Sequence, residues 1–463
     1  MITARAFAGK HYAVLGLARS GLATVEALLA SGARVTAWDD KEEVGAALQS
    51  SPSLLGEVAA AQRLTEGPLH HPSDGPPPRG KLGEELEVTD FTSSDLTQFD
   101  SIVVTPGLPL NRHPIAQRAK EAGVEIIGDI ELFARARPEL PPHKVVGITG
   151  TNGKSTTTAL VHHILQTAGV PSLMGGNIGL PILSQDPLPE GGVYVLELSS
   201  YQLDLTKSLD CDVAVLLNIT PDHLDRYESF EAYAASKNRL LLMQSETPPD
   251  IAFVNWSDFE AGLIHDGQID WKVSFNGIYA PTTEEQSRWP ALQGPHNAQN
   301  AGAAIDACGW LGLSRDQIEE GLRTYPGLAH RMERIREKDG VLFVNDSKAT
   351  NPTATAPALA AFPKIRWILG GQAKTDNLDE CAPHFGHVRK AYTIGEAGEM
   401  FASLLSPHMA VAECVTLEEA VRMAASEAEA GDTVLLSPAC ASFDQFRDYE
   451  ARGDAFRALV GEL

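Results

Sequence analysis

The sequence predicts an α/β protein built from three doubly wound α/β domains. Short apolar runs typical of buried strands alternate with helical segments along the whole chain, which is the pattern of parallel sheets with helical crossovers. Glycine-rich turns follow several of these runs, and 463 residues are too many for a single hydrophobic core. We expect the domains to span residues 1–140, 141–328 and 329–463.

The first domain begins with a Rossmann-like pattern of strand, turn, helix and strand. Residues 12–15 and 34–38 are the predicted strands, and residues 22–30 are the helix between them. The turn at residues 16–21 reads G-x-A-x-x-G, a variant of the dinucleotide fingerprint, and Asp39 follows the second strand, where an acid can bind a ribose hydroxyl. The motif leaves two interpretations open, a nucleotide site and a plain turn that ends at Asp39.

The remainder of the first domain carries weaker signals. Residues 64–84 are rich in proline and glycine and are expected to form an exposed insertion, to which we assign no role. His70-His71 within it is expected to be solvated, not a metal site. Residues 101–107 predict a strand that enters a tight turn, and residues 136–143 predict the linker that ends the domain.

The central domain opens on the most informative segment of the chain, residues 147–156, which read GITGTNGKST. An apolar run precedes it and a helical pattern follows, which is the layout of a P-loop. Its glycines let backbone N–H groups face a phosphate, and the helix N-terminus adds partial positive charge. Lys154 can reach the β- and γ-phosphates, and Ser155 can ligate Mg²⁺. The spacing departs from the strict motif, which would place a glycine at Ile148.

Polar residues follow two further predicted strands of this domain, at residues 193–198 and 213–219. Glu197 ends the first, where a carboxylate beside a P-loop can bind Mg²⁺. His223 lies in the polar segment after the second and could ligate a metal or orient a carboxylate. Lys237 lies on a predicted helix, and nothing local distinguishes it from an exposed lysine.

The third domain, expected to be Rossmann-like, alternates again, with predicted strands at residues 341–344, 367–371, 391–394 and 433–436. Its polar segments are candidate binding groups, because an arginine fork suits a transferring phosphoryl group and a turn of small residues can hold a carboxylate. These segments contain Arg331 at the domain boundary, Asp346 and Lys348 after the first strand, and Ser442 in the final turn.

Composition excludes several classes of function. The net charge of −24 argues against nonspecific nucleic-acid binding, which needs a basic surface. Five scattered cysteines without a C-x-x-C pair fit reduced thiols in the cytoplasm. No apolar run is long enough to span a membrane, and the N-terminus lacks a signal-peptide core. We therefore expect a cytoplasmic protein without nucleic-acid or membrane partners. We also expect a monomer, although the composition carries no signal of oligomeric state.

Taken together, these motifs resemble the Mur ligases, the ATP-dependent amide-forming enzymes of peptidoglycan synthesis. The resemblance covers essentially the whole chain and rests on GITGTNGKST, LELSSYQLD, LNITPDHLDRY, GPHNAQN, HRME, NDSKATNPTAT and LLSPACASFDQF. NDSKATN and SPACASFDQF point to the members that add D-glutamate. The resemblance implies that the first domain binds UDP-N-acetylmuramoyl-L-alanine, the central domain ATP with two Mg²⁺ ions, and the third D-glutamate. It also implies an acyl-phosphate intermediate. As a separate hypothesis, we expect the three domains to close on ligands about hinges near residues 136–143 and 322–331.

The resemblance also assigns roles residue by residue. The implied catalytic residues are Lys154, His223, Lys237, Arg331 and Lys348. Nucleotide contacts are implied for Gly150, Thr151, Asn152, Gly153, Lys154, Ser155, Thr156, Asn300, Arg331 and Asp346, with Asn300 at adenine and Asp346 at ribose. Metal ligands are implied at Ser155, Glu197, His223 and Lys237, the lysine as its carbamate. Implied substrate contacts are Leu17, Ala18, Asp39, Thr105, Pro106 and Gly107 for uridine diphosphate, Asn177 and Ser199 for muramoyl-alanine, and Lys348, Thr350, Lys374, Ser442 and Phe443 for D-glutamate.

Three alternatives compete with this interpretation. A P-loop NTPase switch would not need the amino-acid pocket that NDSKATN and SPACASFDQF suggest. A Mur ligase for another amino acid is disfavoured because Lys374 and Ser442 suit a substrate with two carboxylates. A purely binding paralogue is disfavoured by the intact catalytic set. Asp40, next to Asp39, departs from the family pattern, since a second acid near a diphosphate is unfavourable unless it points away.

Overall fold

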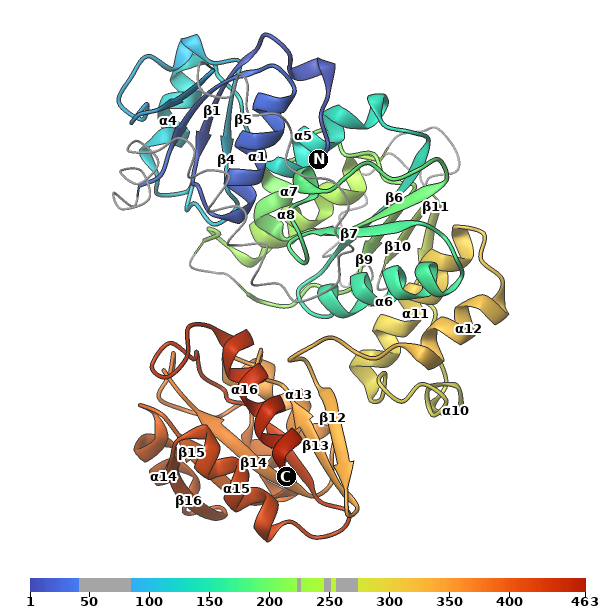
Figure 1. Cartoon of the computed structure of the whole chain (residues 1–463), viewed down its shortest axis with the longest axis vertical. Helices are drawn as coiled ribbons and strands as arrows, with labels where there is room; N and C mark the ends of the chain where they lie inside the picture. The colour runs from blue at the N-terminus through green and yellow to red at the C-terminus, as the bar shows by residue number, and fades with distance from the viewer. Residues whose placement is uncertain (41–84, 223–225, 245–250, 255–273) are drawn as a thin grey trace. The chain divides into compact units, whose positions relative to one another are not determined.

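A computed structural model describes residues 1–40, 85–222, 226–244, 251–254 and 274–463. The chain is an α/β protein, as predicted, and the described residues form three sheets (Figure 1). It forms two compact units, one of residues 1–281 with 299–321 and the other of residues 282–298 with 322–463. The first unit contains two of the sheets, so the division predicted at residue 140 stays a prediction.

The first sheet is parallel and has the order β3-β2-β1-β4-β5. Its strands are β1 (His11–Leu15), β2 (Arg34–Trp38), β3 (Leu86–Val88), β4 (Ser101–Val104) and β5 (Ile126–Ile127). Its helices are α1 (Arg19–Ala30), α4 (Pro114–Ala122) and α5 (Asp129–Ala136), with single turns η1 (Arg5–Phe7), η2 (Leu96–Gln98) and η3 (Arg137–Glu139). The strand order reverses between β1 and β4, so the turns that follow these two strands meet at the switch point where α/β sheets bind ligands.

The second sheet is also parallel, in the order β11-β10-β9-β6-β8-β7. Its strands are β6 (His143–Thr149), β7 (Ser172–Gly176), β8 (Gly192–Glu197), β9 (Val213–Leu216), β10 (Ile251–Val254) and β11 (Ser274–Gly277). Helical segments in the same stretch of the chain are α6 (Lys154–Thr167), η4 (Ile182–Ser184), α7 (Ser200–Asp204), α8 (Phe230–Leu242), α10 (Thr283–Gln286), α11 (Pro295–Trp310) and α12 (Arg315–Thr324). α10, the start of α11 and the end of α12 belong to the second unit. β6 lies between β8 and β9 in the sheet. The P-loop, which follows β6, therefore lies between Glu197 at the end of β8 and the polar segment that follows β9.

A polar network joins the first sheet to the second within the first unit. The Glu125 carboxylate accepts hydrogen bonds from Arg135 at 2.6 and 3.0 Å, from Lys207 at 2.8 Å and from Ser101 at 2.7 Å. Glu131, which is buried, accepts from the backbone N–H groups of residues 207 and 208 at 2.7 and 2.9 Å. Residues 129–143 form α5, the single turn η3 and the first residue of β6. The hydrogen bonds of Glu131 connect this stretch to the central module, by which we mean the second sheet and the segments that join its strands.

This network predicts a pH-dependent contribution to stability. Hydrogen bonding to Arg135 lowers the pKa of Glu125 to about 2, against burial, which raises it. A carboxylate with a depressed pKa stabilises the fold above its ordinary pKa and loses that contribution as the pH falls toward the depressed value. We expect Glu125→Gln to lower the free energy of unfolding by about 1–2 kcal/mol at pH 7. The difference from wild type, measured by urea denaturation, should shrink between pH 4.5 and about 2; a constant difference would contradict the assignment.

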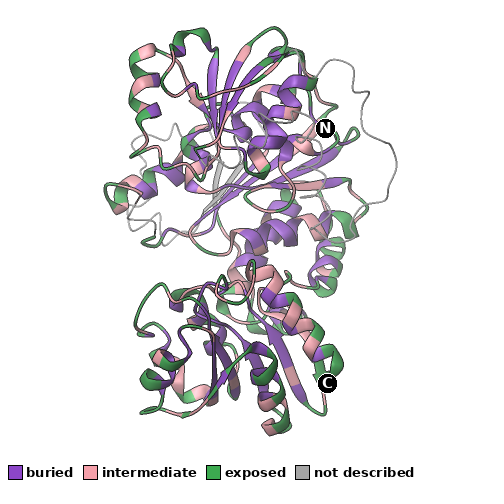
Figure 2. Ribbon diagram, turned by 60° about the vertical axis from the view of Figure 1, so that its left-hand side comes forward, coloured by how far each residue is buried: buried purple, intermediate pink, exposed green. Residues whose placement is uncertain are grey.

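The third sheet has the order β12-β13-β17-β14-β15-β16 and one antiparallel edge, β12 against β13. Its strands are β12 (Glu333–Lys338), β13 (Val341–Asn345), β14 (Ile365–Gly370), β15 (Val388–Ile394), β16 (Ala410–Val415) and β17 (Thr433–Leu436). Its helices are α13 (Pro352–Ala360), η6 (Ala382–His387), α14 (Gly398–Leu405), α15 (Leu417–Glu427) and α16 (Tyr449–Glu462). Separate apolar clusters contain inward-facing residues of these strands, and all four residues of β17 are buried. Figure 2 shows that buried residues are concentrated in the strands and that exposed residues are frequent on the helices.

Most predicted elements are confirmed, and their bounds differ by a few residues. α1 begins at Arg19, not Leu22, and α6 begins at Lys154, before the predicted start at residue 157. β9 ends at Leu216, so Asn218 lies in the turn beyond it. All five cysteines are buried free thiols. Among the described residues, no helix is long and apolar enough to cross a membrane. Residues 64–84 lie outside the described part of the chain.

Candidate functional site

The P-loop joins β6 to α6 and is held in place by the turn after β9. Thr151 N–H donates to the Asn218 carbonyl at 2.8 Å, and Asn152 N–H donates to the Asn218 side-chain oxygen at 2.8 Å. Gly153 has a φ of +85°, and a Cβ there would lie 2.2 Å from Asn300 Oδ1. Glycine is therefore required at this position for both conformation and space.

The Lys154 ammonium folds back over this loop. Its Nζ donates to the Gly150 carbonyl at 2.9 Å and to the Thr151 carbonyl at 2.8 Å. Lys154 is also the first residue of α6, whose first N–H groups have no acceptor within the helix and so favour an anion. The structure thus brings the cation and the helix N-terminus to the same loop, as the sequence predicted.

Glu197 presents an unused carboxylate oxygen beside the P-loop strand. β8 pairs with β6 in the register that sets Ile148 opposite Glu197. The carboxylate is buried; its Oε1 accepts from Asn177 Nδ2 at 2.9 Å, whereas its Oε2 has no hydrogen-bond partner among the described residues. A buried oxygen without a donor suits a hard cation, which prefers carboxylate and hydroxyl oxygens. No cluster of three or more His, Cys, Asp or Glu lies within the described ranges, so Mg²⁺ would need Glu197, a hydroxyl such as Ser155 and ligand oxygens.

Lys237 is buried, which corrects the interpretation of an exposed helical lysine. Only 1% of the residue is accessible; its Nζ donates to the Gly150 carbonyl at 2.8 Å and lies 4.6 Å from the centre of the Tyr233 ring. Burial first, and the charge of Lys154 second, lowers the pKa of Lys237 to about 6. Its amine is therefore largely neutral at pH 7 and nucleophilic. Spacing could have revealed this burial, because residues 233, 234, 237, 240 and 241 form one buried face of α8.

Fewer structural observations describe the other predicted contact residues of the central domain. Asn300 is buried on α11, with its Oδ1 3.3 Å from Thr157 Oγ1 of the P-loop helix. Ser199 caps α7, where it accepts from the N–H of Gln202. His223 lies outside the described residues.

The turns after β1 and β4 meet in the first sheet, as expected for a switch point. A Cβ at Gly16, whose φ is +93°, would lie 2.2 Å from Thr105 Oγ1. The Asp39 carboxylate accepts from the N–H of Leu17 at 2.6 Å, so it also fixes the turn. Oδ2 of Asp40, the second acid, lies 3.0 Å from His113 Nε2. The carboxylate of Asp40 therefore has a histidine as its partner.

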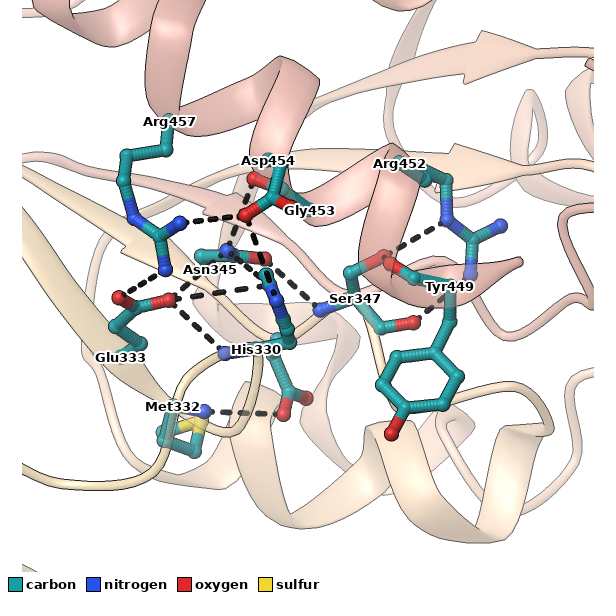
Figure 3. Close-up of polar contacts among 11 residues, drawn as sticks. His330, Met332, Glu333, Asn345, Ser347, Tyr449, Arg452, Gly453, Asp454 and Arg457 are labelled. Atoms are coloured by element: carbon teal, nitrogen blue, oxygen red, sulfur yellow. Dashed lines mark hydrogen bonds and ion pairs between the residues drawn. The ribbon is translucent and has the colours of Figure 1, made fainter. Parts of the chain in front are cut away.

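In the second unit, Arg331 lies on a constrained turn between two residues with positive φ, His330 at +61° and Met332 at +48°. His330 N–H donates to Glu333 at 2.9 Å, and Arg457 donates to the other oxygen of Glu333 at 2.6 Å. Figure 3 shows these side chains pointing toward one another, with Asn345 bonded to the His330 ring at 3.0 Å. Such backbone persists only where its surroundings fix it.

Asp346 follows β13 and is tied to the same turn. Its Oδ1 accepts from the N–H of Met332 at 3.1 Å, and its Oδ2 accepts from Ser437 Oγ at 2.8 Å. Burial raises the pKa of Asp346 to about 7, against the Ser437 hydrogen bond. The group is therefore shared between acid and carboxylate near neutral pH, and a partner that stabilises either form will shift it.

Arg452, which the sequence did not single out, joins the three loops that carry the predicted amino-acid contacts. Its guanidinium is buried and donates to the carbonyl and hydroxyl oxygens of Ser347 at 2.8 and 3.0 Å. It also donates to the carbonyls of Cys440 at 3.0 Å, Ala441 at 3.3 Å and Gly370 at 3.5 Å. These loops follow β13, β17 and β14, which are adjacent in the sheet.

Around this centre, the structure gathers some predicted contacts and not others. Gln372 pairs with Ala441, which brings the segments of Lys374 and Ser442 together. Phe443 is 69% exposed. Tyr449, which was not predicted, lies with its ring centre 5.1 Å from Lys348 Nζ. Thr350 follows Lys348 in a turn closed by their backbone groups at 2.9 Å.

Replacement of Arg452 by lysine is expected to destabilise the second unit by about 3 kcal/mol, because one ammonium cannot satisfy five buried acceptors in three loops. The free energy of unfolding from urea denaturation measures this loss. Arg447→Lys is the matched control: Arg447 is exposed and its carboxylate contact is with its neighbour Asp448. Equal stability of the two variants would show that Arg452 does not organise the loops.

Comparison with known proteins matches most of the chain to one family. Residues 148–285 match the Mur ligase middle domain, and residues 330–440 match the glutamate ligase domain of Mur ligases. The UDP-N-acetylmuramoylalanine–D-glutamate ligase of Novosphingobium aromaticivorans is 56% identical, with all of this chain and 97% of the relative covered. The enzyme of that name from Sphingopyxis alaskensis is 55% identical with full coverage of both chains.

Solved structures agree at the level of fold. The MurF ligase of Thermotoga maritima in complex with ADP has a TM-score of 0.56 at 14% identity, over 98% of this chain and 96% of that one. A UDP-N-acetylmuramate–alanine ligase from the same organism has a TM-score of 0.55 at 17% identity, over 98% and 99%. Both matches span both units of the chain.

Proposed function

The chain belongs to the Mur ligase family, and from this premise we propose that it joins D-glutamate to UDP-N-acetylmuramoyl-L-alanine at the expense of ATP, a step of peptidoglycan synthesis. Relatives named UDP-N-acetylmuramoylalanine–D-glutamate ligase align with the whole length of the chain. The structural observation that carries the proposal is the meeting of Lys154 and Lys237 at one P-loop carbonyl, Gly150 O. The cation of Lys154 suits a transfer in which negative charge gathers on phosphoryl oxygens, and the neutral amine of Lys237 beside it is available for modification.

The chemistry requires activation of a carboxylate. The carboxylate of the alanyl group attacks the γ-phosphorus of ATP, a C–O–P bond forms, and the bond to ADP breaks. The amine of D-glutamate then attacks the acyl carbon, loses a proton and expels inorganic phosphate. Lys154 neutralises charge on the transferring group, and the constrained Arg331 is proposed to add its planar fork.

We propose that Ser155 and Glu197 hold one Mg²⁺, which would neutralise phosphate charge, and that His223 and carbamylated Lys237 hold a second. The neutral amine of Lys237 is suited to this modification: its lone pair bonds to the carbon of CO₂ and a proton leaves. A buried neutral amine then becomes a buried anion with two oxygen ligands. The Oε2 of Glu197, which has no hydrogen-bond partner among the residues that the structure describes, supports the first site.

The substrate contacts are proposed by region. The uridine diphosphate would bind at the turns of Gly16 and Thr105, through Leu17, Ala18, Asp39, Pro106 and Gly107, and the muramoyl-alanine at Asn177 and Ser199. Asn300 and Asp346 would bind adenine and ribose. Lys348, Thr350, Lys374, Ser442 and Phe443 would bind D-glutamate, to which we add Tyr449 because its ring lies beside Lys348. We also propose that the enzyme acts in the cytoplasm, which five buried free thiols fit, and that it is a monomer.

Phosphate release tests the proposal. The protein is given ATP, Mg²⁺ and UDP-N-acetylmuramoyl-L-alanine, and the amino acid is varied over D-glutamate, L-glutamate, L-alanine, L-lysine and meso-diaminopimelate. We expect release that requires both the nucleotide substrate and D-glutamate. Release without an amino acid would indicate an NTPase, and release with another amino acid would overturn the assignment of the pocket.

A further inference from the structure

A single arginine connects the first two sheets at the proposed substrate turn. Arg226 follows the turn after β9, whereas Gly107 and Leu108 follow β4 of the other sheet. The Arg226 guanidinium donates to the Gly107 carbonyl at 3.3 Å and to the Leu108 carbonyl at 2.9 Å. The Asn111 side chain donates to the Arg226 carbonyl at 3.0 Å, so the contact is formed in both directions.

The guanidinium of Arg226 also contacts an aromatic group. Its central carbon lies 4.3 Å from the centre of the Tyr201 ring, a cation–π geometry. Tyr201 stacks on Tyr227 with ring centres 6.0 Å apart and an interplanar angle of 11°. Tyr227 contacts Tyr233 at 5.4 Å. The aromatic rings therefore fix the orientation of the guanidinium that donates to the two carbonyls.

This aromatic group continues to the phosphate loop. The Tyr233 hydroxyl lies 3.1 Å from Thr151 Oγ1, and the Tyr233 ring carries Lys237 Nζ at 4.6 Å. Packed side chains thus run from the turn after β4 to the P-loop and the buried lysine. No proposed ligand contact accounts for Arg226 itself.

We propose that Arg226 is a positioning residue for the reaction: it sets the turn of residues 105–111 against the central sheet, so that a substrate held by its uridine diphosphate presents its carboxylate to the P-loop. The inference rests on the proposed function. An arginine suits the task because its planar fork reaches two carbonyls at once, which the single ammonium of a lysine does not match. A positioning error of about 1 Å at a reacting group can reduce rates by about a hundredfold.

The test compares Arg226→Gln and Arg226→Lys with wild type. The dissociation constant for UDP-N-acetylmuramoyl-L-alanine is measured by calorimetry without ATP or D-glutamate, and KM is measured for all three substrates. We expect both variants to weaken binding of the uridine substrate about tenfold, or about 1.4 kcal/mol, and to lower kcat, measured in the same assays, by up to about a hundredfold. KM for ATP and for D-glutamate should change by less than about twofold. Asn111→Ala should weaken binding of the uridine substrate less in the Arg226→Gln protein than in the wild type, because both side chains contribute to one contact.

Arg239→Lys is the matched control. Arg239 also donates to two carbonyls, of Leu203 at 2.8 Å and Thr206 at 2.7 Å, but both acceptors lie within the central module. It should leave affinity for the uridine substrate unchanged, even if it lowers stability.

Each outcome decides the question. Wild-type affinity in Arg226→Lys would show that charge alone matters and would overturn the positioning role. Equal rises in all three KM values, matching those of Arg239→Lys, would indicate a general structural role and overturn it as well. A wild-type protein that binds the uridine substrate and forms no amide would refute the proposed function, and the binding comparison would still judge Arg226.

Discussion

Replacement of Lys154 by methionine should reduce D-glutamate-dependent phosphate release by at least about a hundredfold, the typical loss for one preorganised charge at a reacting group. Lys154 Nζ bonds to two carbonyls of the loop, so it is placed before a ligand arrives. Methionine has a similar length and no charge, so the expected loss reflects electrostatics rather than packing. The rate at saturating substrates is the measurement.

Lys144→Met is the control for this change. Lys144 lies near the start of β6, the strand that leads to the P-loop at its other end. Its replacement should leave the rate within about twofold of wild type. If Lys154→Met also kept near-wild-type turnover, the phosphate role assigned to Lys154 would be wrong.

Replacement of Lys237 by alanine should also reduce turnover by at least about a hundredfold. The proposed carbamate is lost with the amine, and with it a pair of oxygen ligands. A short carboxylic acid added to the assay should restore part of the activity, because it can occupy the space left by the side chain. Near-wild-type turnover without the added acid would refute the proposed modification.

The same residue predicts a conflict between function and stability. Because burial lowers the pKa of Lys237 to about 6, the folded protein disfavours a proton that the unfolded chain binds readily. Lys237→Met should therefore be more stable than wild type in buffer free of CO₂ and metal, although inactive. Because the pKa is lowered, the free energy of unfolding of the wild type should rise as the pH increases from about 6 toward the ordinary lysine value of 10.5. The difference in this free energy between the methionine variant and the wild type should narrow over the same range. A methionine variant less stable than wild type at pH 7 would contradict this account.

The strands and the phosphate loop could be predicted because their signals are local. β17 coincides with the predicted residues 433–436, and the glycine-rich loop needs no distant contact to be recognised. β12 was missed because its sequence, ERIREK, is highly charged. Charge is expected on an edge strand, since it discourages pairing with other chains, but it removes the apolar signal on which sequence interpretation relies.

The residues that were missed depend on contacts between distant segments. Arg452 satisfies carbonyls that lie up to 105 positions away in the chain, and Arg226 reaches a turn 118 positions earlier. Arg452 belongs to no local pattern that would distinguish it from a surface arginine, and Arg226, although it lies in the LNITPDHLDRY segment, was given no role from the sequence. Lys237 is intermediate, because helical spacing marks its face while its charge suggests the opposite. Physical reasoning from sequence thus located the loops better than the side chains that position them.

Oxygen transfer tests the central claim most directly. UDP-N-acetylmuramoyl-L-alanine labelled with ¹⁸O in its carboxylate is turned over with ATP, Mg²⁺ and D-glutamate, and the released phosphate is analysed by mass spectrometry. Attack of the carboxylate on ATP predicts one ¹⁸O atom in each phosphate released, since the amine expels the oxygen that joined carbon to phosphorus. Phosphate without ¹⁸O would show that water attacks ATP directly, and would contradict an acyl-phosphate ligase.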